Sequence, residues 1–70
     1  MVVRTLLYFV VPEDDRWAVL IDDRRYLFAT EAGALRAAVD AAGLDRAGGA
    51  MVEIRVLSRD GAWRVEPLRD

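Results

Sequence analysis

The sequence contains neither cysteine nor histidine, and these two absences exclude several kinds of protein. Without cysteine the chain has no disulfides and no thiolate ligands or nucleophiles. Without histidine, a zinc site would have carboxylate ligands alone, and the usual proton donor and acceptor of catalysis at neutral pH is missing. We therefore predict that the chain is not an enzyme and has no catalytic residue, metal site or cofactor.

Lysine, asparagine and glutamine are also absent, so all ten basic residues are arginines. This composition is typical of a high-GC genome, although arginine is also the residue that makes bidentate contacts to phosphate or carboxylate. The ten arginines face twelve acidic residues, for a net charge of −2. Domains that bind nucleic acid normally carry a positive excess, so nucleic acid is a possible but disfavoured partner.

The chain has only 70 residues, which predicts a single domain spanning residues 1–70. A domain of this size buries roughly 60% of the surface that its unfolded form exposes, so its stability is marginal. Small scaffolds compensate with disulfides, a metal, efficient packing or oligomerisation. Because the first two are excluded here, packing and oligomerisation remain.

A long hydrophobic run is missing as well. The apolar run after Thr5 has six residues and stops at Pro12, whereas a helix needs about 20 residues to span a bilayer. The acidic residues that follow do not resemble the cleavage site of a signal peptide. We expect a cytoplasmic protein without a membrane partner.

Three apolar segments near the start of the chain are predicted to be strands. Residues 5–11 are apolar at odd and even positions alike, as in a strand buried on both faces, and residues 16–22 and 24–29 follow. Turn residues lie between them at 12–15 and at Asp22-Asp23. Such short connections indicate an antiparallel meander.

Residues 30–44 have the pattern of an amphipathic helix. Thr30 is the expected N-cap, because its hydroxyl can accept a hydrogen bond from the first turn. Gly43 is expected at the left-handed position after the helix, with Leu44 folded back on Val39 and residues 45–50 forming a flexible loop. One apolar stripe at helical spacing contains Leu35, Ala38, Val39 and Ala42.

Residues 51–58 and 62–67 are predicted to form a hairpin. Asp60-Gly61 is the strongest hairpin signal in the chain and indicates a two-residue type I′ turn. A slip of one residue would exchange the two faces of the strand, so the register matters. The predicted register sets Val56 opposite Val65 and Arg55 opposite Glu66.

These elements predict an α+β fold in the order β-β-β-α-β-β, with one mainly antiparallel sheet and a single helix packed on one face. The strand order is left open, because the connection through the helix can return to either edge. The helix is assigned to the face that carries Trp17, Phe28, Ile54, Val56 and Val65. A four-residue loop at 12–15 would place Leu6, Tyr8 and Val10 on that face too, and a bulge would reverse this.

One thin, alanine-rich helix can cover only one face of such a sheet. The opposite face then carries Leu7, Phe9, Leu20 and Leu27, which together could expose a few hundred Å² of apolar surface. We predict a protein interface at these four residues, most simply a two-fold homodimer, although another protein is an alternative partner. Two alternatives need no partner: loop 45–50 or the tail 67–70 folds over this face, or a bulge scatters the four residues.

The hydroxyls and paired carboxylates carry little catalytic signal. Thr5, Thr30 and Ser58 have no candidate base nearby in the sequence. The acidic pairs Asp14-Asp15 and Asp22-Asp23 lie in predicted turns, where aspartate is a common residue. The run "AGG" at 47–49 lacks the Lys and Ser or Thr that a phosphate-binding loop needs.

Four short motifs occur in an order that resembles a small bacterial family. They are "VVP" at 10–12, "WAV" at 17–19, "TEAGA" at 30–34 and "RDG" at 59–61. The chain resembles the domain-of-unknown-function family 2188 over about residues 8–66. The resemblance implies a compact α+β domain with no established activity, so it supplies no site residues.

The chain departs from that family at Gly33, where the family tends to have glutamate. The departure removes the side chain that would complete a capping box, and it indicates close approach to another backbone or simple drift. A weaker resemblance is to HicB-like antitoxin domains, which share the meander and the start of the helix. That resemblance implies a regulatory domain that binds a small toxin, but the hairpin at 51–67 is extra.

Overall fold

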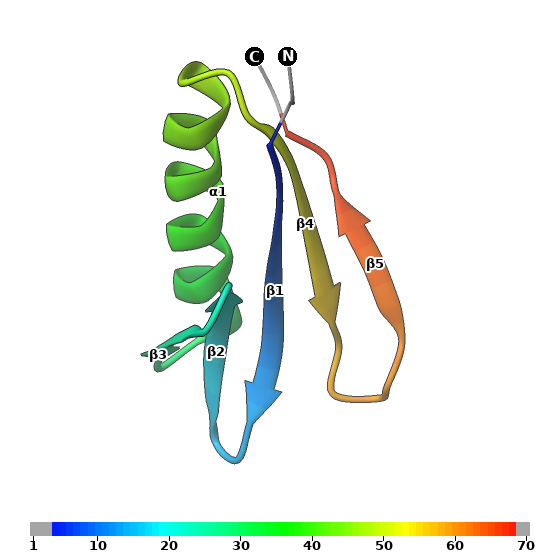
Figure 1. The fold of residues 1–70 in the computed structure, drawn as a ribbon. Coiled ribbons are helices and arrows are strands. Elements are labelled where there is room, and N and C mark those ends of the chain that lie inside the picture. The colour runs from blue at the N-terminus through cyan, green and yellow to red at the C-terminus, as the bar shows by residue number, and fades with distance from the viewer. Residues whose placement is uncertain (1–3, 69–70) are drawn as a thin grey trace.

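The computed structural model describes residues 4–68, in which five strands and one helix form two layers (Figure 1). The helix lies along one face of the sheet and contacts four of the strands. The expected α+β fold in the order β-β-β-α-β-β is thereby confirmed. The elements are β1 (Thr5–Glu13), β2 (Arg16–Ile21), β3 (Arg24–Phe28), α1 (Glu31–Ala47), β4 (Met51–Leu57) and β5 (Trp63–Glu66).

The strands are arranged in the order β3-β2-β1-β4-β5. β1 and β4 run parallel at the centre, and the other neighbours run antiparallel. α1 carries the chain from the edge strand β3 across the sheet to the far side of β1, because parallel strands need a long crossover connection. β1 was expected to be buried on both faces, but only its even-numbered residues Leu6, Tyr8 and Val10 are buried, because α1 covers one face of the sheet and Leu7 is 37% exposed on the other.

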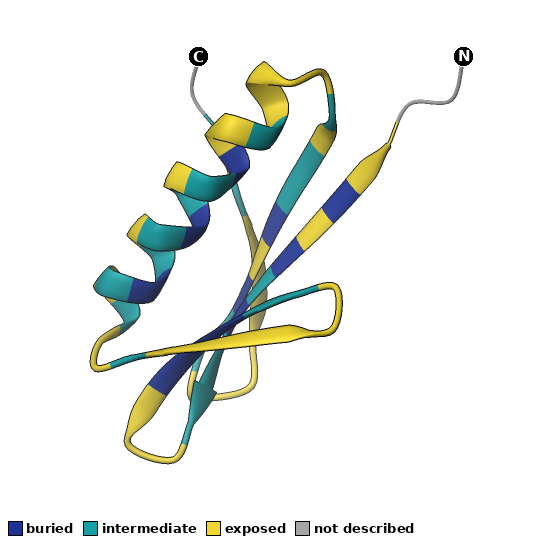
Figure 2. Ribbon diagram, turned by 60° about the vertical axis from the view of Figure 1, so that its left-hand side comes forward, coloured by how far each residue is buried: buried dark blue, intermediate teal, exposed yellow. Residues whose placement is uncertain are grey.

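The core lies between α1 and the central strands, where the buried segments face one another (Figure 2). Val10, Ile54 and Val56 are fully buried, and each contributes roughly 1.5–3 kcal/mol by leaving water. The alanines on the inner side of α1 let the helix approach these larger side chains closely. The core consists of Leu6, Tyr8, Val10, Trp17, Val19, Ala34, Ala38, Ala42, Ile54 and Val56.

The first hairpin is tighter than the sequence suggests. Glu13 pairs with Arg16, so the loop has the two residues Asp14 and Asp15 instead of the four at 12–15. Pro12 lies within β1, beyond the last residue of β1 that pairs with β4. Its missing N–H therefore removes no hydrogen bond from the ladder between β1 and β4. The even-numbered residues of β1 still share the face of Trp17, as predicted.

α1 continues past Gly43 and ends at Ala47, so the predicted helix end is wrong. A Cβ added to Gly43 would meet no atom within 4 Å, and Leu44 is 77% exposed instead of folding back on Val39. The hydroxyl of Tyr8 donates a hydrogen bond to the carboxylate of Asp45, two residues beyond the glycine. This contact between β1 and α1 favours an additional turn over the local tendency of Gly43 to end the helix.

The hairpin between β4 and β5 differs from the prediction by one residue. Gly61 has a φ of 93°, and its amide donates to the carbonyl of Ser58, while the amide of Ser58 donates to the carbonyl of Ala62. This geometry is a three-residue loop with glycine in the left-handed position, not a two-residue type I′ turn. The predicted register is therefore wrong, and the pairs are Ile54–Glu66, Arg55–Val65, Val56–Arg64 and Leu57–Trp63.

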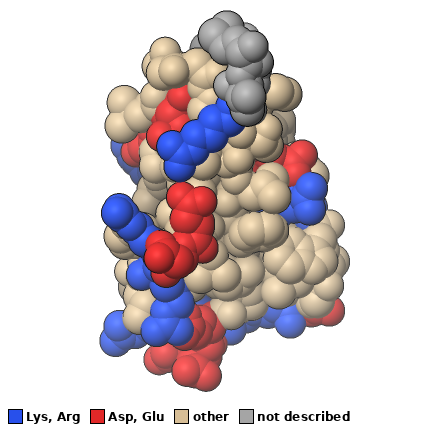
Figure 3. Space-filling view, in the orientation of Figure 1, with Lys and Arg blue, Asp and Glu red and all other residues tan. Residues whose placement is uncertain are grey.

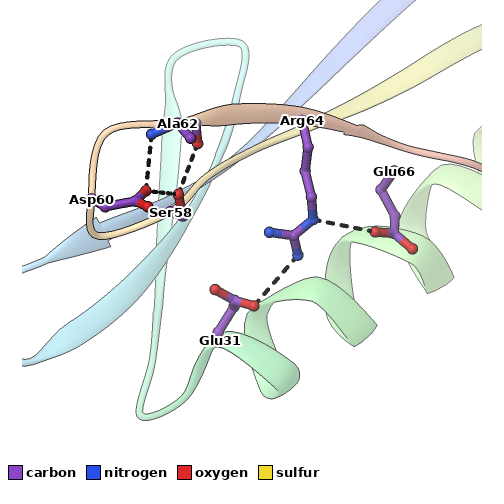
Figure 4. A network of polar contacts seen from close by, with 6 residues as sticks. All are labelled: Glu31, Ser58, Asp60, Ala62, Arg64 and Glu66. Carbon is purple, nitrogen blue, oxygen red and sulfur yellow. Dashed lines mark hydrogen bonds and ion pairs between the residues drawn. The ribbon is translucent and has the colours of Figure 1, made fainter.

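The corrected register turns the charged residues of β5 toward α1 (Figure 4). The guanidinium of Arg64 lies 3.4 Å from the carboxylate of Glu31 at the start of the helix and 3.9 Å from that of Glu66. In the adjacent loop, the hydroxyl of Ser58 donates to the carboxylate of Asp60, which also accepts the amide of Ala62. The hydrogen bond from Ser58, which has the larger effect, and the hydrogen bond from Ala62 both lower the pKa of the Asp60 carboxyl.

Candidate protein interface on the open face of the sheet

The sheet face turned away from α1, called the open face below, carries the four residues predicted as an interface. Phe9 in β1 lies opposite Leu20 in β2, and Leu27 in β3 lies opposite Ala18, which shares the face of Leu20. Leu7 shares the face of Phe9, two residues along the same strand. The strand register thus brings all four side chains to one surface across three neighbouring strands.

These side chains are exposed to different degrees. Leu7 is 37% exposed and Leu27 is 45% exposed, whereas Phe9 and Leu20 are half-buried at the middle of the sheet. Isolated exposed leucines are common on soluble proteins, but a continuous group of them is less common. The open face therefore has an apolar centre that remains accessible in the isolated chain.

Two large residues of β5 enlarge this surface: Trp63 was not predicted here, and the assignment of Val65 to the face of the helix is wrong. Trp63 is 55% exposed and Val65 is 58% exposed, and both lie on the open face because of the corrected register of β5. The rings of Phe9 and Trp63 form an edge-to-face pair with centroids 6.0 Å apart and an interplanar angle of 80°. Gly61 was a signal for this register in the sequence, because hairpin loops of three residues that contain glycine are the next most common after loops of two residues.

The two segments considered as covers do not shield this face within residues 4–68. Ala50, at the end of the loop 45–50, and Leu68, in the tail, both pack against the core, which lies on the helix side of the sheet. No bulge scatters the four residues either, because the ladders of β1, β2 and β3 are continuous over them. The apolar surface is therefore not buried by the described part of the chain.

Two arginines of the open face, Arg25 and Arg55, are paired with acids. The guanidinium of Arg25 bonds to the carboxylate of Glu13, and that of Arg55 bonds to the carboxylate of Glu53. Such exposed pairs contribute little to folding stability. They do reduce the positive potential that a phosphate backbone would meet, so the surface is apolar with balanced charges around it.

Two of the hydroxyls and two of the aspartates considered for catalysis have structural roles. The hydroxyl of Thr30 accepts a hydrogen bond from the amide of Gly33 at 3.0 Å and caps the helix, and Ser58 holds the loop of the last hairpin. Asp14 and Asp22 adopt positive φ angles of 54° and 53° at the tight turns. A Cβ on Gly33 would meet the hydroxyl of Thr30 at 3.2 Å, so its near neighbour is the cap itself and not another backbone.

Residues 4–68 contain no helix that is both long and apolar enough to cross a membrane, and no group of three or more acidic side chains placed to hold a metal ion. Comparison of the chain with protein-family models, with curated proteins and with solved structures gave no match.

Proposed function

We propose that this protein is a non-enzymatic interaction module that forms a homodimer through the open face of its sheet. The observation that carries the proposal is the apolar surface formed by Leu7, Phe9, Leu20 and Leu27 and enlarged by Trp63 and Val65. Two copies related by a two-fold axis would present the same surface to each other, so one set of residues suffices for a closed assembly.

The size of the open face is compatible with a stable dimer. Five strands about 4.8 Å apart, each roughly six residues long at about 3.3 Å per residue, make a face of roughly 24 by 20 Å. Side chains corrugate this footprint of roughly 480 Å², so its accessible area is of the same order as the ~800 Å² that each partner buries in a standard interface. The apolar part of this area contributes ~25 cal/mol per Å² when it is buried, and this free energy offsets the loss of translational and rotational freedom on association.

The proposal predicts that a charge at the centre of the face separates the copies. Phe9→Glu and Leu20→Arg are both expected to give soluble monomers, because the dimer would bury an unpaired charge. Sedimentation equilibrium on the wild type and both variants measures this directly. Leu44→Glu is the matched control, since Leu44 is 77% exposed on α1, away from the open face, and its replacement is expected to leave the dimer intact.

A wild-type chain that sediments as a monomer would contradict the dimer. If the wild type is a monomer that binds a second protein, and Phe9→Glu abolishes that binding, the surface serves a heterologous partner, as the HicB-like resemblance implies. Membership of the domain-of-unknown-function family 2188 also remains a proposal, which rests on the order of the four motifs in the sequence.

A second candidate function is supported by the aromatic pair on the open face. Phe9 and Trp63 lie beside Arg55, and aromatic and arginine side chains on an open sheet can stack on single-stranded nucleic acid. The pairing of Arg55 with Glu53 and the net charge of −2 oppose this function. Titration of a labelled single-stranded oligonucleotide at low ionic strength tests it, and an unchanged signal would exclude it.

A further inference from the structure

A cleft of about 510 Å³ opens on the other side of the sheet, between α1 and the strands β1, β2 and β3. It lies where α1 packs less closely over β3 than over β4, β2 and β1. Ala37 and Ala41 form its wall on the helix, and their side chains are too short to reach the strands across the gap. The volume lies within the range of sites that bind small molecules, roughly 300–1,000 Å³.

The floor of the cleft is apolar and partly aromatic. Leu6, Val19 and Ile21 contribute hydrocarbon from β1 and β2, and Phe28 and Tyr26 contribute rings from β3. Tyr26 is 46% exposed, so its ring is accessible at the mouth of the cleft. Apolar walls with a few polar groups are the usual lining of a small-molecule site.

The polar groups of the cleft are acidic in sum. Three carboxylates line it, from Asp22, Asp23 and Asp45, against two guanidinium groups, from Arg4 and Arg24. Arg4 lies 3.8 Å from Asp22, so these two charges largely offset each other. Figure 3 shows acidic and basic side chains interspersed on the face seen in that view, with no large region of one sign.

Asp45 occupies a special position among these groups. One of its carboxylate oxygens accepts a hydrogen bond from the hydroxyl of Tyr8, which fixes the side chain against the floor of the cleft. A carboxylate has about four acceptor sites, so this single bond leaves acceptors for a donor that enters the cleft. Asp45 is therefore a fixed negative group next to an apolar surface.

We propose that this cleft binds a small organic cation, an aliphatic amine whose hydrocarbon lies on the apolar floor and whose ammonium group meets Asp45. Aromatic rings attract ammonium groups through their faces, and Tyr8 and Tyr26 both line the cleft. A carboxylate ligand of the same shape would meet the excess of negative charge instead. The ligand class thus follows from the apolar floor and the sign of the charges.

Binding is tested with three probes of six carbon atoms each: hexylamine, hexanol and hexanoate. Each is titrated into the ¹⁵N-labelled full chain at neutral pH, and the amide shifts of Ala37, Ala41 and Val19 are followed by NMR. We expect saturable shifts with hexylamine and an affinity about tenfold lower for hexanol and lower still for hexanoate. Equal affinities for all three would overturn the proposed ligand class, and shifts that do not saturate would overturn the site.

Two variants and two controls locate the binding. Ala41→Phe fills the cleft and is expected to abolish the hexylamine shifts, and Asp45→Asn is expected to weaken hexylamine about tenfold while leaving hexanol unchanged. Asp40→Asn changes the net charge equally from an exposed position on the same helix and should have no effect. Phe9→Glu should also bind hexylamine normally, because Phe9 lies on the opposite face. Equal losses in Asp40→Asn and Asp45→Asn would contradict a site at Asp45.

Discussion

At the scale of single residues, Tyr8 shows how one buried hydroxyl connects two layers. Its side chain is 5% exposed, and its hydroxyl donates to Asp45 on α1. Burial, followed by the hydrogen bond to Asp45 and the negative charge of that carboxylate, raises the pKa of Tyr8 to about 12. The neutral hydroxyl is thus the form that the folded protein favours, since a phenolate would lose its hydration and repel Asp45.

This shift predicts a loss of stability in alkali. The unfolded chain releases the Tyr8 proton near pH 10, whereas the folded chain retains it to about pH 12. The stabilisation that comes from the retained proton is therefore complete below pH 10 and is lost as the pH rises through 12. The free energy of unfolding falls by about 2–3 kcal/mol over this range. Urea unfolding between pH 9 and pH 12 measures it, and Tyr8→Phe should lack this decrease. Ionisation of Tyr8 near pH 10, read from the phenolate absorbance of the wild type minus that of Tyr8→Phe, would contradict the shift.

At the scale of elements, two glycines illustrate opposite requirements. Gly61 has a φ of 93° in the loop between β4 and β5, a conformation that costs a residue with a Cβ about 1–2 kcal/mol. Gly43 lies inside α1 with ordinary helical geometry and no atom within 4 Å of an added Cβ. The same substitution should therefore have opposite signs at the two positions.

Gly61→Ala is predicted to lower the free energy of unfolding by about 1–2 kcal/mol, and Gly43→Ala to raise it by up to about 1 kcal/mol. Denaturant unfolding of both variants beside the wild type provides the measurement. A destabilised Gly43→Ala would show that the helix does end at this glycine. An unchanged Gly61→Ala would argue against the left-handed loop residue, and with it against the register of β5.

Between elements, Arg59 connects its own loop, between β4 and β5, with the loop between β1 and β2. Its guanidinium donates to the carbonyl oxygens of Asp14, at 2.7 Å, and Arg16, at 3.2 Å. The same group lies 5.1 Å from the ring centroid of Trp17, within the range of a cation–π contact. Arginine rather than lysine suits this position, because its planar group can stack on a ring and donate several hydrogen bonds together.

At the scale of the whole molecule, the sheet has one covered face and one open face. α1 buries the even-numbered side chains of β1 and β4, while Leu7 and Phe9 on the opposite parity remain at least partly accessible. A domain of this size has little stability of its own, so association through the open face would contribute a large share of the total. Folding and dimerisation would then be coupled.

That coupling predicts an unfolding temperature that depends on protein concentration. Because dissociation accompanies unfolding, a tenfold increase in concentration should raise the midpoint by roughly 3–5 °C. Differential scanning calorimetry at two concentrations measures the shift. Phe9→Glu should unfold at a lower temperature that no longer varies with concentration. A wild-type midpoint that is the same at both concentrations would count against the dimer.

The sequence determined the local features of this protein. Apolar and aromatic segments bounded by turn residues located every strand to within about two residues, because such residues favour the extended backbone locally. The alternation of side chains along a strand placed Leu7, Phe9, Leu20 and Leu27 together on the face opposite the helix. Thr30 was identified as the cap because capping depends only on the first helical turn.

Only the tertiary structure decided the strand order, the end of α1 and the register of β5. The parallel pairing of β1 with β4 joins distant segments, and the hydrogen bond from Tyr8 to Asp45 extends the helix past Gly43. The loop at Gly61 has one residue more than the shortest turn, which moves Trp63 and Val65 to the open face. In each case the energies of competing local structures are close, and contacts between residues far apart in the chain select among them.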